Sequence, residues 1–166
     1  KEDMWISRIP VPVEINASAH ADDDFSKNKS IAELTDWNIY SPVWAPVSLE
    51  DQWLKLQDKD PFDYAKVERK IPASKELKVS FDLKAGQNNK GTLHIEFLDE
   101  NGIACSRMEL TDDGIFRLKG GSRFANMMKY EAGKVYHVEA VLSTVDRNIQ
   151  VYVDGKRVGL RMFYAP

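Results

Sequence analysis

The chain has 166 residues, of which 43% are hydrophobic and 30% are charged, and its formal net charge is −3. This length fits one domain with its own core, and the ordinary composition excludes a disordered or coiled-coil chain. The negative balance and the lack of a basic stripe argue against a nucleic-acid partner, and no apolar run reaches the roughly 20 residues of a membrane helix.

The N-terminal segment is apolar but contains Pro10 and Pro12, which cannot donate hydrogen bonds to a neighbouring strand and therefore favour a sheet edge. We expect residues 1–30 to form an extended linker that packs on a sandwich domain of residues 31–166. Because the chain opens at Lys1 without an initiator methionine, we interpret it as a piece cut from a longer protein.

The following part of the first half predicts short elements. Residues 21–24 (Ala-Asp-Asp-Asp) are typical of a solvated loop, and residues 31–34 could form one helical turn. Short strands are expected near residues 37–40, 44–49, 52–56 and 64–71.

The second half alternates apolar and polar residues with a period of two, which places one set on a core face and the other in water. The alternating runs are residues 77–85, 93–97, 136–142, 149–153 and 158–162. Asn101-Gly102, Asp113-Gly114 and Asp154-Gly155 are dipeptides favoured in tight hairpins. Many strands joined by hairpins, with no helix between them, predict an all-β fold, a two-sheet antiparallel jelly-roll sandwich.

Several of these runs resemble the closing strands of concanavalin A-like lectin/glucanase and laminin-G-like domains. The resemblance rests on Gly91–Asp99, on Tyr130–Val138 and on the hairpin Val151–Lys156 (Val-Tyr-Val-Asp-Gly-Lys). It covers roughly residues 35–164, and it specifies a fold rather than a function.

A narrower resemblance comes from Trp5–Val13 and Leu56–Arg69, which look like segments of polysaccharide-degrading proteins of gut Bacteroidetes. In those proteins a sialidase-like β-propeller precedes a sandwich of this kind. The resemblance implies a C-terminal accessory domain of an exported, periplasmic or cell-surface protein, with an upstream catalytic domain in the same polypeptide. No family catalytic residue carries over to this chain.

One run suggests glycosidase carboxylates but has the wrong spacing. Glu96 and Asp99 do not share a strand face, and Asp99-Glu100 leads into the Asn101-Gly102 turn. Glycoside hydrolysis needs two carboxyl groups across one bond. We therefore interpret this run as a solvated strand end and predict no catalytic residues.

The acidic residues Asp58, Asp60 and Asp63 have two readings. Oxygen ligands spaced in a loop can hold calcium, although Pro61 and the lack of a glycine exclude an EF-hand loop. The simpler interpretation is a solvated turn that begins at Asp60-Pro61. Calcium is the only cofactor that the sequence suggests.

Aromatic and basic residues are the candidates for glycan binding, because sugar rings stack their C–H faces on aromatic rings. His94 and His137 fall on polar strand faces and could line one sheet surface, Tyr152 faces outward, and Arg117 and Arg123 near Gly120-Gly121 would suit an acidic glycan. The candidate carbohydrate-binding residues are Trp44, Tyr64, His94, Arg117, Arg123, Tyr130, His137 and Tyr152.

These observations favour a non-catalytic accessory domain, either carbohydrate-binding or architectural, of a polysaccharide-processing protein. Two alternatives stay open: an autonomous glycoside hydrolase or polysaccharide lyase acting in the concave face of the sandwich, and a protein-interaction module. The enzyme would need two convergent titratable groups in one groove, and the interaction module a large exposed apolar patch.

Overall fold

The computed structural model describes residues 21–59 and 61–165. The chain divides into two compact units, Lys1–Pro72 and Ala73–Pro166, which we call the N-terminal unit and the sandwich unit. The prediction for the segment 1–13 lies outside the described residues, so the proposed linker of residues 1–30 stays a prediction. Within the described part of the chain, no helix is long and apolar enough to cross a membrane.

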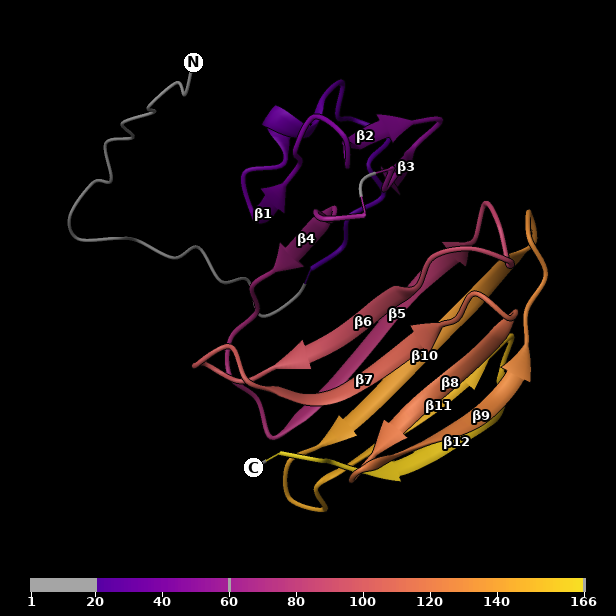
Figure 1. The fold of residues 1–166 in the computed structure, drawn as a ribbon. Helices are drawn as coiled ribbons and strands as arrows, with labels where there is room; N and C mark the ends of the chain where they lie inside the picture. Colours follow the sequence, from indigo (N-terminus) through magenta and orange to yellow (C-terminus); the bar gives the residue numbers. More distant parts are fainter. Residues whose placement is uncertain (1–20, 60, 166) are drawn as a thin grey trace. The chain divides into compact units, whose positions relative to one another are not determined.

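The sandwich unit consists of two four-stranded antiparallel sheets, with the strand orders β12-β11-β10-β5 and β6-β7-β8-β9 (Figure 1). Its strands are β5 (Glu76–Lys84), β6 (Leu93–Leu98), β7 (Ala104–Leu110), β8 (Ile115–Gly120), β9 (Arg123–Lys129), β10 (Val135–Ser143), β11 (Asn148–Val153) and β12 (Lys156–Met162). The prediction of an all-β, two-sheet antiparallel sandwich is confirmed.

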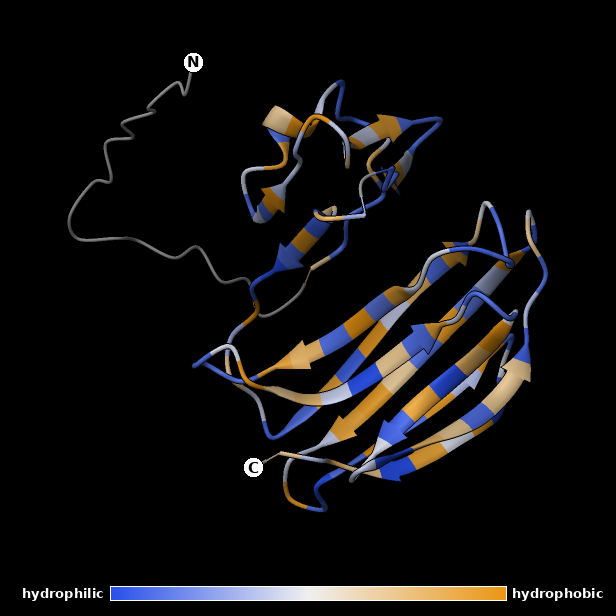
Figure 2. Cartoon of the chain, viewed as in Figure 1, coloured by the Kyte–Doolittle hydropathy of each residue, from blue (hydrophilic) through white to orange (hydrophobic). Residues whose placement is uncertain are grey.

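The core lies between these two sheets and follows the period-two pattern of the sequence. Hydrophobic and hydrophilic residues alternate along the strands of the sandwich unit (Figure 2). Met108 and Leu118 from one sheet and Val138, Ile149 and Val151 from the other are fully buried in a single hydrophobic cluster. Burying each such side chain contributes about 1.5–3 kcal/mol relative to leaving it in water.

Glycines close the predicted hairpin turns. Gly102, Gly114 and Gly155 adopt φ angles of 77°, 76° and 77°, in the left-handed region where a side chain costs free energy and glycine does not. The turn dipeptides of the sequence therefore mark true chain reversals. Strands β7, β8 and β9 all fall between the alternating runs from which strands were predicted.

Among its described residues, 21–59 and 61–72, the N-terminal unit holds four short strands in two antiparallel pairs, β1 with β4 and β2 with β3. Its elements are the 3-10 helix η1 (Ile31–Glu33) and the strands β1 (Trp37–Tyr40), β2 (Val47–Glu50), β3 (Trp53–Leu56) and β4 (Lys66–Arg69). They agree with the turn and short strands expected from the sequence.

Arg69 joins two segments of this unit. Its guanidinium makes ion pairs with Asp23 at 3.1 Å and with Asp36 at 3.3 Å. The acidic run 21–24 was expected to be a solvated loop. Asp23 is instead attached to β4, while Asp24 accepts a hydrogen bond from the backbone N–H of Ser26.

Candidate functional site

The outward side of the β6–β9 sheet carries an unusual density of charged side chains. Strand register places His94, Glu109 and Arg117 in one row across β6, β7 and β8, and it places Glu96 opposite Arg107 in the next row. We call this surface the polar face, and its members are His94, Glu96, Arg107, Glu109, Arg117, Lys119 and Phe124.

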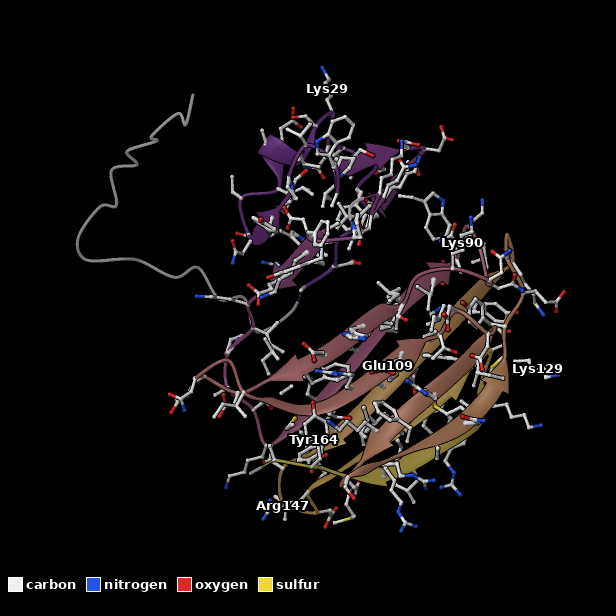
Figure 3. The ribbon with its side chains drawn as sticks, viewed as in Figure 1. Lys29, Lys90, Glu109, Lys129, Arg147 and Tyr164 are labelled. Atoms are coloured by element: carbon white, nitrogen blue, oxygen red, sulfur yellow. The ribbon has the colours of Figure 1, made fainter. Side chains whose placement is uncertain are left out.

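Glu109 is the centre of the polar face (Figure 3). Although it points away from the hydrophobic core, only 3% of its surface is exposed. One carboxylate oxygen accepts hydrogen bonds from Arg117, with Nε at 2.8 Å and Nη2 at 2.7 Å. The other oxygen lies 3.4 Å from His94 Nε2 and 3.6 Å from Arg107 Nη1. Cationic or hydrogen-bonding groups thus surround a buried carboxylate, as a charge removed from water requires.

Arg107 links Glu109 to a second carboxylate. Its Nε lies 2.6 Å and its Nη2 2.5 Å from the same oxygen of Glu96. Burial by itself would lower the pKa of Arg107, but the hydrogen bond and the charge of Glu96 outweigh it and raise that pKa. Glu96, Arg107, Glu109 and Arg117 thus form a chain of alternating charge. The ion pairs hold each of these side chains in one orientation.

Aromatic rings lie beside the cations of the polar face. The guanidinium carbon of Arg117 is 4.3 Å from the centroid of Phe124. The ammonium of Lys119 is 4.2 Å from the ring centroid of Tyr164 and 5.8 Å from that of Phe124. Tyr164 is held there by its backbone N–H, which donates to the carbonyl of Cys105 at 3.0 Å. Burial raises the pKa of the Tyr164 hydroxyl.

The sequence pattern missed the two residues that organise this face, Arg107 and Glu109. A usable signal was present, since Arg107 and Glu109 alternate with Met108 and Leu110 in the same period of two as the predicted strands. Glu96, expected at a solvated strand end, is instead ion-paired to Arg107.

The structure separates the predicted glycan contacts of the sandwich unit. His94 and Arg117 meet at Glu109, whereas His137 lies on the other sheet, with Nδ1 2.8 Å from Asp82. The prediction that the two histidines line one sheet surface is therefore wrong.

The remaining three predicted contacts of this unit lie apart from Glu109. Tyr152 is also on the β10–β11 sheet, where its hydroxyl donates to Gln150. Arg123 is exposed at the start of β9. Tyr130 is a core residue, 5% exposed, whose hydroxyl donates to the carbonyl of Thr111 at 2.7 Å. Its burial leaves no ring face for a sugar.

The two other predicted contacts, Trp44 and Tyr64, belong to the N-terminal unit and are 67% and 57% exposed. Tyr64 packs on Tyr40, with ring centroids 5.4 Å apart and the rings inclined by 50°. Beside them Asp63 accepts a hydrogen bond from the Tyr40 hydroxyl at 3.2 Å.

The acidic turn proposed as a calcium site is only partly described, because Asp60 lies outside the described residues. Both oxygens of Asp63 accept hydrogen bonds, one from Tyr40 and one from the backbone N–H of Tyr64. Among the residues that the structure describes, no three His, Cys, Asp or Glu side chains are grouped to hold a metal ion. Calcium binding through Asp58, Asp60 and Asp63 stays a prediction.

The sandwich unit thus carries ordered polar groups beside aromatic rings on one of its sheets. The chain belongs to the family described as Sialidase-like, CBM domain, that is, a carbohydrate-binding module, whose model matches residues 37–166.

A solved structure titled "Sialidase" is similar to the chain, with 89% sequence identity and a TM-score of 0.93. The match covers 99% of this chain but only 15% of that protein. No curated protein compared with the chain matches it.

Proposed function

We propose that this chain is a non-catalytic accessory module that binds an acidic glycan through the polar face. It would serve an exported polysaccharide-processing protein whose catalytic domain lies elsewhere in the same polypeptide. The match to 15% of a protein titled "Sialidase" supports a place in a longer chain. The two antiparallel four-stranded sheets support a concanavalin A-like identity for the sandwich unit.

The charge of the polar face supports an acidic ligand. Arg107, Arg117 and Lys119 supply three cations against the two carboxylates of Glu96 and Glu109, which leaves one positive charge. Lys119 has aromatic rings as its neighbours on this face. A sugar carboxylate beside Lys119 and Arg117 would gain charge-assisted hydrogen bonds, and Phe124 and Tyr164 would border its ring.

The pairing of the two carboxylates supports a non-catalytic module. A glycosidase needs one carboxyl group that gives a proton to the leaving oxygen and a second that acts as nucleophile or base. Glu96 is bound by Arg107 and Glu109 by Arg117, through ion pairs of 2.5 and 2.7 Å. Both carboxyl groups are thus engaged by arginine side chains, which favours a structural ion-pair network over an acid–base pair.

Calorimetric titration with sialyllactose and with lactose tests the proposal, because the two sugars differ by one carboxylated residue. We expect the chain to bind sialyllactose more tightly than lactose, and Lys119→Gln to weaken that binding at least tenfold without disturbing the Glu109 ion pairs. Lys78→Gln, on the other sheet, is the matched control and should bind as the wild type does. Equal binding of the two sugars, or equal affinity of Lys119→Gln and the wild type, would refute the acidic-glycan proposal.

A further inference from the structure

We infer that the N-terminal unit carries a second glycan site of different chemistry, in which Tyr40 and Tyr64 stack on the apolar face of a neutral sugar ring beside Asp63. This tyrosine platform, defined by these three residues, is independent of the acidic-glycan proposal because it lies in the other unit.

The exposure of the tyrosine pair is the first argument. Tyr40 is 47% and Tyr64 57% exposed, although the rings contact each other at 5.4 Å between centroids. Aromatic rings bury large areas when they serve as core residues, and these two keep about half of their surface in water. Each ring thus offers area to a ligand, while the contact between the rings limits their motion.

The order of Asp63 is the second argument. Its Oδ1 accepts the backbone N–H of Tyr64 at 2.9 Å, and its Oδ2 accepts the Tyr40 hydroxyl at 3.2 Å. This hydrogen bond raises the pKa of Tyr40. Since each carboxylate oxygen has two lone pairs, both oxygens retain capacity to accept sugar hydroxyl groups. The platform therefore combines stacking area with a hydrogen-bond acceptor whose orientation is fixed in advance.

The loop that follows β1 and the loop that precedes β4 carry further exposed aromatic side chains. Trp44 is 67% and Phe62 96% exposed. The backbone N–H of Lys59 donates to the carbonyl of Trp44 at 2.9 Å, which ties the loop after β1 to the loop before β4. Scattered single apolar residues on a surface need no explanation, but Trp44 and Phe62 add exposed aromatic side chains close in sequence to Tyr40 and Tyr64.

The charge of Asp63 selects the class of sugar. A sugar carboxylate placed against this aspartate would meet a like charge, whereas the hydroxyl groups of a neutral sugar can donate to it. The platform therefore takes a neutral polysaccharide, and it rejects the acidic ligand proposed for the polar face. A chain with both sites could hold two different glycans.

Affinity electrophoresis through gels containing a β-glucan, a xylan, a galactomannan or a galactan tests this inference. We expect at least one neutral polymer to retard the wild type, and Tyr64→Ala to lose at least tenfold in affinity for it. Asp63→Asn keeps the shape of the side chain and should weaken binding less. Tyr152→Ala, a tyrosine of the sandwich unit, is the matched control and should migrate as the wild type does.

Circular dichroism and tryptophan fluorescence of each variant separate a lost site from a lost fold. If a variant unfolds, Tyr64→Leu replaces it, since leucine keeps apolar volume but offers no aromatic face. No retardation by any of the four polymers, or equal retardation of wild type and folded Tyr64 variants, would overturn the inference. The sialyllactose titration is unaffected by that result, so the two proposals fail separately.

Discussion

Replacing Glu109 by alanine removes the carboxylate at the centre of the polar face and leaves its cations without their shared partner. Arg117 loses two hydrogen bonds, of 2.8 and 2.7 Å, and Arg107 and His94 lose a neighbouring charge. We expect the sandwich unit to become markedly less stable, although no residue of its hydrophobic core changes.

The size of this loss follows from burial. Breaking a fully buried ion pair costs about 3–5 kcal/mol, because the remaining charge has no partner. Here the carboxylate is 4% exposed, but the side chains of Arg107 and Arg117 are 28% and 36% exposed. Water can therefore solvate the released guanidinium groups in part, and the expected loss falls to about 2–3 kcal/mol.

Urea unfolding followed by far-ultraviolet circular dichroism measures this loss, and a midpoint shift of about 1–2 M corresponds to it for a small domain. Glu139→Ala is the matched control, since Glu139 also lies on a strand and pairs with a lysine, Lys78, at 2.7 Å. Because the Lys78 side chain is 64% exposed, the control should lose less than about 1 kcal/mol.

A Glu109→Ala variant no less stable than Glu139→Ala would refute this reasoning. Burial of the carboxylate would then not increase the free energy lost when its ion pairs are removed. The variant Glu109→Gln refines the comparison. It keeps the shape and one oxygen acceptor, so it should fall between wild type and alanine.

Three further predictions concern packing, acid and the two units. Gly159→Ala should cost about 1–3 kcal/mol, because a Cβ there would lie 2.7 Å from the Met127 sulfur, while Gly86→Ala, with no atom within 4 Å, should change little in the same urea titration. Backbone N–H groups, first that of Ile103, hold the pKa of Asp99 below its ordinary value of 3.8. The contribution of Asp99 to the stability of the fold is therefore present above that value and is lost as the pH falls through the lower pKa of the folded state. The difference in stability between wild type and Asp99→Asn should shrink in acid, and a constant difference would contradict this account. All four tryptophans precede the boundary between the units, so tryptophan fluorescence should report the N-terminal unit. We expect the transition followed by fluorescence to lie at a different urea concentration from the transition followed by circular dichroism. Coincident transitions would mean that the units unfold together.

The sequence predicted the strands whose alternation was strict, and it could not predict how they pair. The runs that became β5 and β10 have the same period, yet nothing in either shows that they pair with each other across more than 50 residues, with Val79 opposite Ala140. For the same reason His94 and His137 were expected on one surface. Periodicity states which side of a strand a residue faces, but not which sheet the strand joins.

The candidate site was predictable only in part, because burial of a charge depends on partners from other strands. Glu109 looks like any outward residue of an alternating strand, and Arg117 becomes its partner only through the β7–β8 register. Tyr130 shows the converse case. It was a candidate glycan contact, whereas its hydroxyl donates to the carbonyl of Thr111 inside the core.

The order of strands along the chain has a consequence for folding kinetics. Strands β6 to β9 follow one another as hairpins between residues 93 and 129, while β5 must wait for β10 to complete its sheet. Contacts between residues close in sequence form faster, since a shorter loop loses less entropy on closing. The Glu109 ion pairs can thus assemble within a contiguous meander before the second sheet is complete, and substitutions in the β5–β10 pair should slow the late step of folding without preventing the early one.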